Sequence, residues 1–484
     1  MQAGFHCTDI TPALGMERPG DYMKVRHNAF HDPLRVRAAV FDDGQSAVAV
    51  VGLDTCILPG HIARRMAQGI EQATGIAAER VLLAASHTHS GGPLWELDPA
   101  LLAGADPLLV RLATEFSVEG DPLYIAWVVS QTISAVAEAW RRRQPARLAV
   151  GLGHEDEVAH NRRFRMANGR SATHPGKGNP DIIEPAGPTD PAVGVVSAWT
   201  PDGRLLGCLV NYTCHCTVGP GGISADWVYY LEQTIQALHA DAAVVFLQGA
   251  SGDVTQVDNR HPRPSEFGEA WTRRVGTRVG AEALRVLASA EPEEAWTVAA
   301  ETVELTLARR VPHADKVAAA RALVEAALAG GERDHRFTFA KERLLAAHLQ
   351  RVSPTLAVPV QALRLGSALL LANPAELFCA LGLAIKAGSP CPATMVVELA
   401  NGCVGYVPGD EPFSAEGGGY ETQLTAYSTL EVGAGRAIVE ASLALAHRQA
   451  LRQARRLAIE PQTAPAAPKA AGVWNYGGMP PEWD

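Results

Sequence analysis

Two histidines, His87 and His89, follow a short apolar run from Val81 to Ser86. A run of this kind predicts a buried strand, and side chains two residues apart on an extended backbone point to the same side. The two imidazoles would then lie roughly 6–7 Å apart. Both could bind one metal ion, or one could bind it while the other acts on a substrate. Since the strand leads directly into Gly91-Gly92, we interpret this segment as part of a functional site.

Polar side chains also follow four other predicted strands, mostly in loops marked by glycine or proline. They are His215 after Cys208 to Thr213, Asp253 and Thr255 after Ala243 to Gln248, Glu376 after Ala368 to Ala372, and Tyr406 after Thr394 to Val404. Loops at one edge of a sheet commonly carry the residues of a binding or catalytic site. The five strand ends together therefore predict a site that holds a metal ion and acid or base groups.

Each of these residues also has a structural interpretation. Asn373 and Glu376 have the spacing of a helix capping box, in which Glu376 only closes the first turn. Asp253 would stabilise a glycine-flanked turn, and Tyr406 would be an ordinary core tyrosine. The functional interpretation depends on their coincidence at strand ends and not on any one residue.

The eight cysteines are scattered, and no Cys-x-x-Cys pair occurs. We expect reduced thiols. Cys214 and Cys216 flank His215 and could form a thiolate metal site with it, but neighbours on a strand point to opposite faces. His215 and the two thiols are therefore not expected to share one ion.

The elements that must position these residues are alternating strands and helices. Hairpins are predicted around Asp42-Asp43-Gly44, Pro201-Asp202-Gly203 and Gly366-Ser367, because such turn residues join apolar runs there. Helical periodicity marks residues 62–73, 122–143, 226–238, 266–288, 314–329 and 435–457. This order predicts an α/β class of mixed α+β layers, with mixed sheets flanked by helices and the metal site at strand ends. The sequence shows no internal repeat.

We expect one catalytic domain over residues 1–457, with a helical insertion at about 312–352. The polar segment 165–192, rich in glycine and proline, is long enough to predict a loop that covers the active site. Residues 458–484 read as an extended Ala/Pro-rich tail that ends with Trp474, Tyr476 and Trp483. Exposed aromatic rings are costly, so this tail is expected to pack on its own or a neighbouring subunit, which would make a homo-oligomer.

Composition excludes several classes of protein. With 484 residues, of which 47% are hydrophobic, the chain can bury a large core. The formal net charge of −10, with both signs interleaved, leaves no basic stripe for nucleic acid. No apolar stretch approaches the length of a membrane span and no signal sequence is evident, so we expect a cytoplasmic protein without an integral membrane segment.

Taken together and in order, these motifs resemble the neutral ceramidase superfamily. The resemblance rests on Asp9-Ile10-Thr11-Pro12, His87-Thr88-His89-Ser90-Gly91-Gly92, Asn161-Arg162, His215, Gly252-Asp253-Val254-Thr255, Pro374-Ala375-Glu376, Gly405-Tyr406-Val407-Pro408 and Tyr420. Each motif alone is weak evidence for the family, but the ordered set of motifs spans nearly the whole chain. The resemblance implies the neutral-ceramidase fold and a Zn²⁺ enzyme.

The resemblance also implies a role for each site residue. His87, His215, Glu376 and Tyr406 would be the zinc ligands, and His89, Arg162 and Tyr420 would contact the substrate carbonyl or transfer protons. Such a ligand set leaves a position for water, whose pKa zinc lowers to about 7. The family has serine where this chain has Thr255, so we expect Thr255 to position groups and not to act as a covalent nucleophile.

Neutral ceramidases continue into a C-terminal β-sandwich that helps to receive a lipid, whereas this sequence ends at Asp484. Together with the polar segment 165–192, this predicts hydrolysis of an amide or ester bond in a small, polar substrate. Two alternatives remain: a true ceramidase, which cleaves N-acylsphingosine, and a non-catalytic binding protein that retains the fold.

Overall fold

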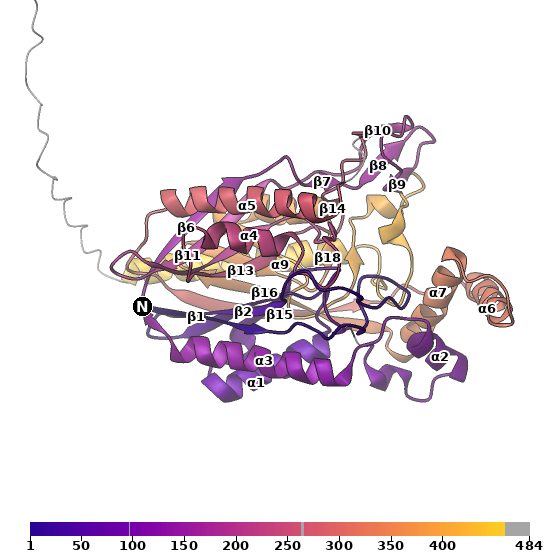
Figure 1. The fold of residues 1–484 in the computed structure, drawn as a ribbon, viewed down its shortest axis with the longest axis horizontal. Coiled ribbons are helices and arrows are strands. Elements are labelled where there is room, and N and C mark those ends of the chain that lie inside the picture. Colours follow the sequence, from indigo (N-terminus) through magenta and orange to yellow (C-terminus); the bar gives the residue numbers. More distant parts are fainter. Residues whose placement is uncertain (96, 263–265, 460–484) are drawn as a thin grey trace, which may run out of the picture.

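The computed structural model describes residues 1–95, 97–262 and 266–459. Within them, one five-stranded and two four-stranded sheets form the body of the molecule, with helices on the outside (Figure 1). The mixed α+β class predicted from the sequence is confirmed. In these described parts, no helix combines the length and apolarity needed to cross a membrane.

The three sheets have the same topology. Each consists of three antiparallel strands in chain order, then a helix, then a fourth strand parallel to the third, and each is followed by a second helix. The first unit is β1 (Gln2–Asp9), β2 (Arg35–Asp42), β3 (Ala47–Leu53), α1 (Gly60–Thr74), β4 (Val81–Ala85) and α3 (Pro122–Arg141). A two-residue strand, β5 (Gln144–Pro145), extends its sheet beside β1.

The second unit is β6 (Arg147–His154), β11 (Ala192–Trp199), β12 (Leu205–Tyr212), α4 (Trp227–Gln236), β13 (Ala243–Gln248) and α5 (Glu269–Ser289). The third is β15 (Val298–Ala308), β16 (Thr355–Leu365), β17 (Ala368–Ala372), α8 (Cys379–Gly388), β19 (Ala393–Val397) and α9 (Ala434–Ile459). The topology thus occurs three times, although the sequences of the three units show no internal repeat.

Strands β2, β3, β12, β13 and β17 are buried on both faces, which explains their continuous apolar runs, whereas β1, β6 and β15 are partly exposed. In β4, Val81 and Leu83 pack against α1 and α3, whereas Leu82 and Ala84 point into a cluster shared by all three sheets. The second and third sheets divide their residues in the same way between their own helices and the shared cluster. The three sheets therefore surround one central apolar core.

Local sequence signals place the ends of these elements. The predicted hairpins are confirmed as β2–β3, β11–β12 and β16–β17. In the first turn Gly44 has a φ of 83°, which suits glycine, and Asp43 accepts hydrogen bonds from the next backbone N–H groups. Asp121 caps α3, with Pro122 at the first helical position.

The predicted helical pair is also present, as α6 (Ala314–Leu328) and α7 (His335–Val352) between β15 and β16. It lies at one end of the molecule beside α2 (Pro107–Glu115), to the right in Figure 1. The predicted aromatic tail, including Trp474, Tyr476 and Trp483, lies outside the described residues.

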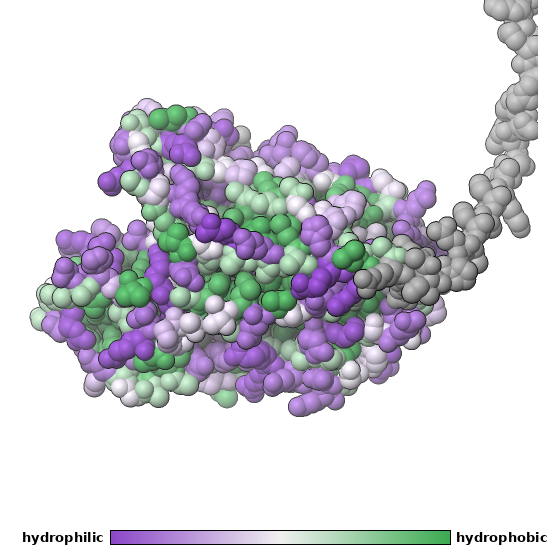
Figure 2. Space-filling model, turned by 180° about the vertical axis from the view of Figure 1, so that it is seen from behind, coloured by the Kyte–Doolittle hydropathy of each residue, from purple (hydrophilic) through white to green (hydrophobic). Residues whose placement is uncertain are grey.

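The segment 165–192 is not the structureless loop that its composition predicts. β8 (Arg163–Met166) pairs with β9 (Ser171–Thr173) and β10 (Ile182–Pro185) in a small antiparallel sheet. This pairing satisfies backbone groups that a long loop would leave without partners. The resulting lobe projects from the body at the same end as α6 and α7 (Figures 1 and 2).

Candidate metal centre

The loops that carry the candidate residues occupy equivalent positions in the three units. The loop after the third strand carries Cys56, His215 or Glu376, and the loop after the fourth strand carries His87, Asp253 or Tyr406. The third and fourth strands of each unit are parallel, so both loops leave at the same edge of their sheet. The repeated topology is what brings segments distant in sequence to one site.

At the centre of this site, two imidazoles converge on one carboxylate oxygen. Nε2 of His87 lies 3.2 Å from Oε2 of Glu376, and Nε2 of His215 lies 3.1 Å from the same atom. All three side chains are buried. Their ligand atoms are close enough to one another to hold a single metal ion.

The hydrogen bonds of the two histidines determine which nitrogen carries the proton. Nδ1 of His87 lies 2.7 Å from the Cys56 carbonyl, and Nδ1 of His215 lies 2.7 Å from the Ser251 carbonyl. Because a carbonyl only accepts, each Nδ1 is the donor, and the lone pairs of both Nε2 atoms face Glu376. Oε2 of Glu376 is buried and receives no hydrogen bond from the described residues. Three electron-rich atoms directed at one point fit a bound cation.

Electrostatics agree with this interpretation. Burial lowers the pKa of His215 to about 4, and the positive charge of Arg162 adds to that shift, so His215 is neutral at pH 7. Burial also favours neutral His87, but the Glu376 carboxylate raises the pKa of His87 well above its usual value. Against the effect of burial, His87 and His215 hold the pKa of Glu376 well below its usual range.

Tyr406 lies beside Glu376 through backbone pairing. The two-residue strands β18 (Glu376–Leu377) and β20 (Tyr406–Val407) are parallel partners, and the Glu376 N–H donates to the Gly405 carbonyl at 2.9 Å. Gly405 has a φ of 74°, a conformation that favours glycine. Burial and the nearby Glu376 raise the pKa of Tyr406 well above its usual value, so the phenol is neutral.

His89 lies closer to the centre than an extended backbone would place it. The predicted spacing is wrong because His87 has a φ of 66°, in the left-handed region, and the chain turns at this residue. Nε2 of His89 is consequently 3.4 Å from Nε2 of His87. Burial, followed by the neighbouring His87 and His215, lowers the pKa of His89 well below its usual value.

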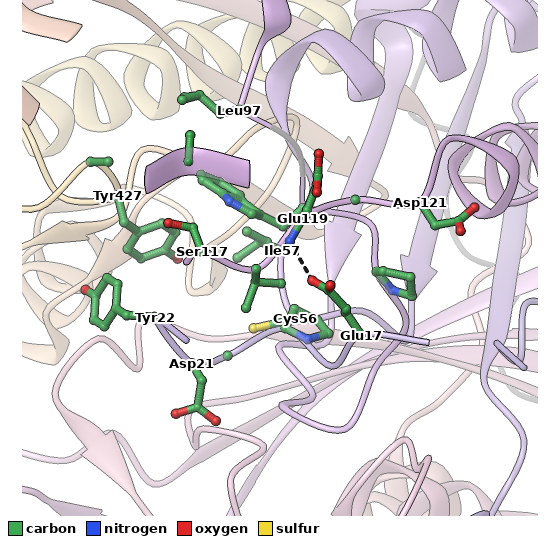
Figure 3. A pocket seen from close by; sticks show the side chains of 18 of the residues that line it. Glu17, Asp21, Tyr22, Cys56, Ile57, Leu97, Ser117, Glu119, Asp121 and Tyr427 are labelled. Atoms are coloured by element: carbon green, nitrogen blue, oxygen red, sulfur yellow. Dashed lines mark hydrogen bonds between the residues drawn. The ribbon is translucent and has the colours of Figure 1, made fainter. Parts of the chain in front are cut away.

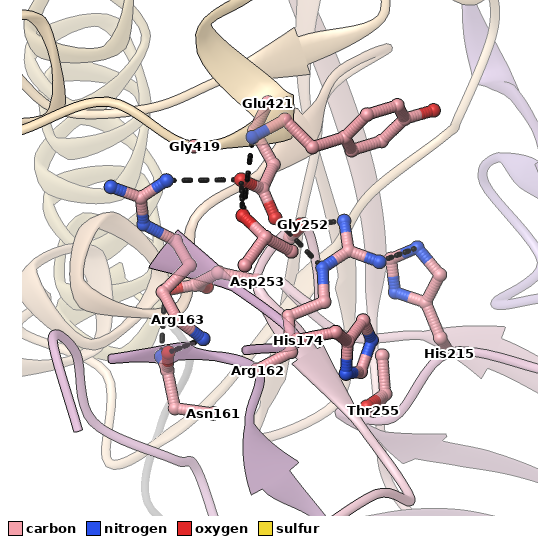
Figure 4. A network of polar contacts seen from close by, with 12 residues as sticks. Asn161, Arg162, Arg163, His174, His215, Gly252, Asp253, Thr255, Gly419 and Glu421 are labelled. Carbon is pink, nitrogen blue, oxygen red and sulfur yellow. Dashed lines mark hydrogen bonds and ion pairs between the residues drawn. The ribbon is translucent and has the colours of Figure 1, made fainter. Parts of the chain in front are cut away.

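Arg162 reaches the centre from the edge of the lobe (Figure 4). Its Nε donates to Glu421 at 2.8 Å, its Nη2 donates to the Gly252 carbonyl at 2.7 Å, and its Nη1 is 3.5 Å from Nε2 of His215. Burial disfavours its charge, but Tyr406 and Glu421 raise its pKa above the usual value. A positive charge is therefore fixed beside the candidate ligands.

Asp253 and Thr255 form hydrogen bonds that stabilise the segments around the site. Asp253 accepts hydrogen bonds from Asn161 at 2.7 Å and from the Cys379 N–H at 2.8 Å. Thr255 lies on β14 (Val254–Thr255), paired with β7 (His160–Asn161), and its hydroxyl accepts from the Val257 N–H at 3.3 Å. Among the described residues that line the cavity, Thr255 does not appear.

Two residues near the centre were missed in the sequence. The Tyr427 hydroxyl donates to Oε1 of Glu376 at 2.6 Å, and Sγ of Cys56 lies 3.8 Å from Nδ1 of His87. Cys56 could have been found, because it follows β3 as His215 follows β12. Tyr427 follows no predicted strand closely, and no local signal marks it.

Cys214 and Cys216 pack into an apolar cluster, and neither joins His215 in a group that could hold a metal among the described residues.

The centre opens into a cavity of about 990 Å³ (Figure 3). His87, His89, Glu376, Tyr406 and Tyr420 lie on its wall. Most of the remaining wall comes from residues 13–26 and 93–122 and from α7, and it is rich in apolar side chains, among them Leu14, Met16, Ile57, Trp95, Leu97, Leu102, Val110 and Leu345. No residue of segment 165–192 is among those that line it, so that segment does not cover the cavity as predicted.

Comparison with known proteins gives a consistent result for the fold. No family model and no curated protein matches the chain. Among the solved structures that match are a ceramidase complexed with C2, with a TM-score of 0.66, 19% identity and coverage of 93% of this chain and 75% of that one, and the neutral ceramidase from Pseudomonas aeruginosa, with a TM-score of 0.65, 20% identity and coverage of 93% and 74%. The chain therefore has a neutral-ceramidase-like fold, as the order of its motifs predicted.

Proposed function

We propose that this chain is a metal-dependent hydrolase that cleaves an amide or ester bond with an activated water. The observation that carries the proposal is the convergence of two Nε2 lone pairs on a buried Glu376 oxygen, beside a large cavity; no described residue donates a hydrogen bond to that oxygen. The similarity to solved ceramidases supports a hydrolase of that type.

The donor set favours zinc. Two imidazoles, one carboxylate and the Tyr406 phenol suit this borderline ion, whereas magnesium and calcium prefer oxygen ligands alone. When bound, the ion supplies Lewis-acid activation of water and of a carbonyl oxygen. His87, His215, Glu376 and Tyr406 would hold it.

The chain's own residues would complete the chemistry. Neutral His89 lies on the cavity wall and can accept a proton. Arg162, held by Glu421, provides a fixed positive charge close to where negative charge would develop on the substrate oxygen. Tyr420 presents a neutral phenol at the same wall, which can donate a hydrogen bond to that oxygen.

The residues of the cavity wall indicate which kind of substrate the chain would accept. The expectation of a small, polar substrate depended on segment 165–192, which does not line the cavity. The apolar wall formed by residues 93–122 and α7 instead favours a substrate with an apolar acyl group. This observation supports the second candidate, cleavage of N-acylsphingosine.

The test combines metal analysis with a substrate screen. Purified protein should hold about one zinc per chain after dialysis, measured by plasma emission, and should hydrolyse members of a series of acyl amides and esters of increasing chain length. His87→Ala should lose both metal and activity. His348→Ala is the matched control, because His348 is equally buried but bonds the Leu101 carbonyl in the helical region. Bound metal without turnover of any substrate would indicate the binding-protein alternative, and wild type without metal would overturn the proposal.

A further inference from the structure

A second cavity lies between α6 and α7. It has a volume of about 590 Å³, and its apolar floor includes Leu323 and Phe339. Lys316, His335, Arg336 and Arg343 line it, and no acidic side chain does. A pocket of this size suits a small organic ligand.

The positive charges of this crevice are largely unpaired. Arg336 is neutralised by Asp334 at 2.7 Å and lies 3.9 Å from Glu332. By contrast, Lys316 and Arg343 form no hydrogen bond or ion pair with any residue in the described parts of the chain, although Arg343 is half-buried. Cations in protein structures are usually paired when they are partly buried, so half-buried Arg343, with exposed Lys316 at the same crevice, favours an anionic ligand.

The crevice shares two walls with the main cavity. Tyr420 lines both cavities. Helix α7 presents Glu342 and Leu345 to the main cavity and Phe339 and Arg343 to the crevice. The Tyr420 ring packs against Tyr22, with centroids 6.2 Å apart, and Tyr22 in turn lies 6.0 Å from Phe339. A row of aromatic rings thus connects the two cavities.

We propose that this crevice binds an amphiphilic carboxylate, with its anionic end between Lys316 and Arg343 and its apolar part on Leu323 and Phe339. The combination of free cations and an apolar floor selects a ligand that has both properties. An amide or ester hydrolase would release such an acid, so the crevice is suited to hold a product next to the site that forms it. Only the identification of this ligand as a reaction product depends on the proposed function.

The test measures binding directly, without turnover. Octanoate is titrated calorimetrically into the full chain after metal removal, so that a carboxylate cannot bind through the metal. Octanol, which lacks the charge, and acetate, which lacks the tail, should each bind at least about tenfold more weakly than octanoate. Because no hydrolysis is measured, failure of the proposed function leaves this result interpretable.

The variant Lys316→Ala/Arg343→Ala should weaken octanoate binding about tenfold, as expected for the loss of two partly exposed charge contacts. Arg64→Ala/Arg65→Ala is the matched control, since it removes two exposed charges from α1, away from α6 and α7 (Figure 1), and it should leave binding unchanged. Thermal melting of both double variants should match wild type.

Two results would overturn the proposal. One is octanoate binding that the Lys316/Arg343 variant leaves unchanged. The other is loss, in this variant alone, of sedimentation with phosphatidylglycerol vesicles while octanoate binding stays intact, which would show that the cations face an anionic membrane surface instead.

Discussion

The Tyr427 hydroxyl donates a hydrogen bond to Oε1 of Glu376 at 2.6 Å, which turns the other carboxylate oxygen, Oε2, towards His87 and His215. The two residues are far apart in sequence, and the contact exists only because two loops of the third unit, before α8 and before α9, meet at the centre. A carboxylate held in this way needs little reorganisation to bind an ion.

Replacing Tyr427 by phenylalanine should therefore weaken metal binding about 10–100-fold, the usual effect of removing a partner of a metal ligand. Competition with a chromophoric chelator measures this affinity. Tyr124→Phe serves as the control, because the Tyr124 hydroxyl likewise donates one hydrogen bond, but to the Ile10 carbonyl in the first unit. An unchanged affinity in Tyr427→Phe would show that Glu376 keeps its orientation without this hydrogen bond.

His89→Ala and Tyr420→Phe should separate catalysis from metal binding. Both residues line the cavity, and in the proposed mechanism they act on the substrate. Each variant should retain nearly stoichiometric zinc and lose roughly 10²–10⁴-fold in rate, the scale for a removed acid, base or oxyanion donor. The short distance from His89 to His87, 3.4 Å, makes the metal measurement decisive. Loss of zinc in His89→Ala would place His89 among the ligands.

Thr255→Ala should reduce turnover without abolishing it. The Thr255 hydroxyl stabilises its own turn by accepting from the Val257 N–H, and it is not among the residues that line the cavity. We expect a structural effect on the rate with zinc binding retained. An acyl group trapped on Thr255 in wild type, detected by mass spectrometry, would instead establish a covalent mechanism.

Glu398 should control how stability depends on pH. It is fully buried, a 2.5 Å hydrogen bond joins it to the Ser251 hydroxyl, and it accepts from the Leu377 N–H at 2.8 Å. Burial raises its pKa to about 8, whereas the pKa in the unfolded chain is about 4.3. Since the folded state holds this proton more tightly, the stabilisation is complete below about pH 4.3 and is lost as the pH rises to about 8.

Glu398→Gln mimics the protonated side chain and should remove that component of the pH dependence, which is on the order of a few kcal/mol. Thermal melts at pH 6 and pH 9 measure it: the variant should melt close to wild type at pH 6 and above it at pH 9. Glu398→Ala should be less stable than wild type at both values, because Ser251 and Leu377 lose their partner. A variant difference that does not change with pH would show that Glu398 is ionised in the folded protein.

Local sequence patterns determined many of the helices, turns and strand ends of this protein. The three hairpins, the helices α1, α3, α4, α5, α6 and α9 that periodicity marked, and the strand ends that carry His87, His215, Glu376 and Tyr406 all follow from short-range signals. These are turn residues with a preference for positive φ, apolar runs of strand length, and helical spacing. Each of these signals depends on residues that are only a few positions apart, so it can be recognised from the sequence alone.

Other features were decided only by tertiary structure. The three-fold repeat of topology was invisible because many sequences satisfy the same pattern of buried strands, and the units need to share only that pattern. The left-handed turn at His87 depends on hydrogen bonds from the His87 N–H to Thr55 and from the His89 N–H to Cys216. Tyr427, Cys56 and the apolar wall reach the site through contacts between segments that lie tens to hundreds of residues apart. Local propensity carries no information about these contacts, and only the packing of the three sheets around one core brings them together.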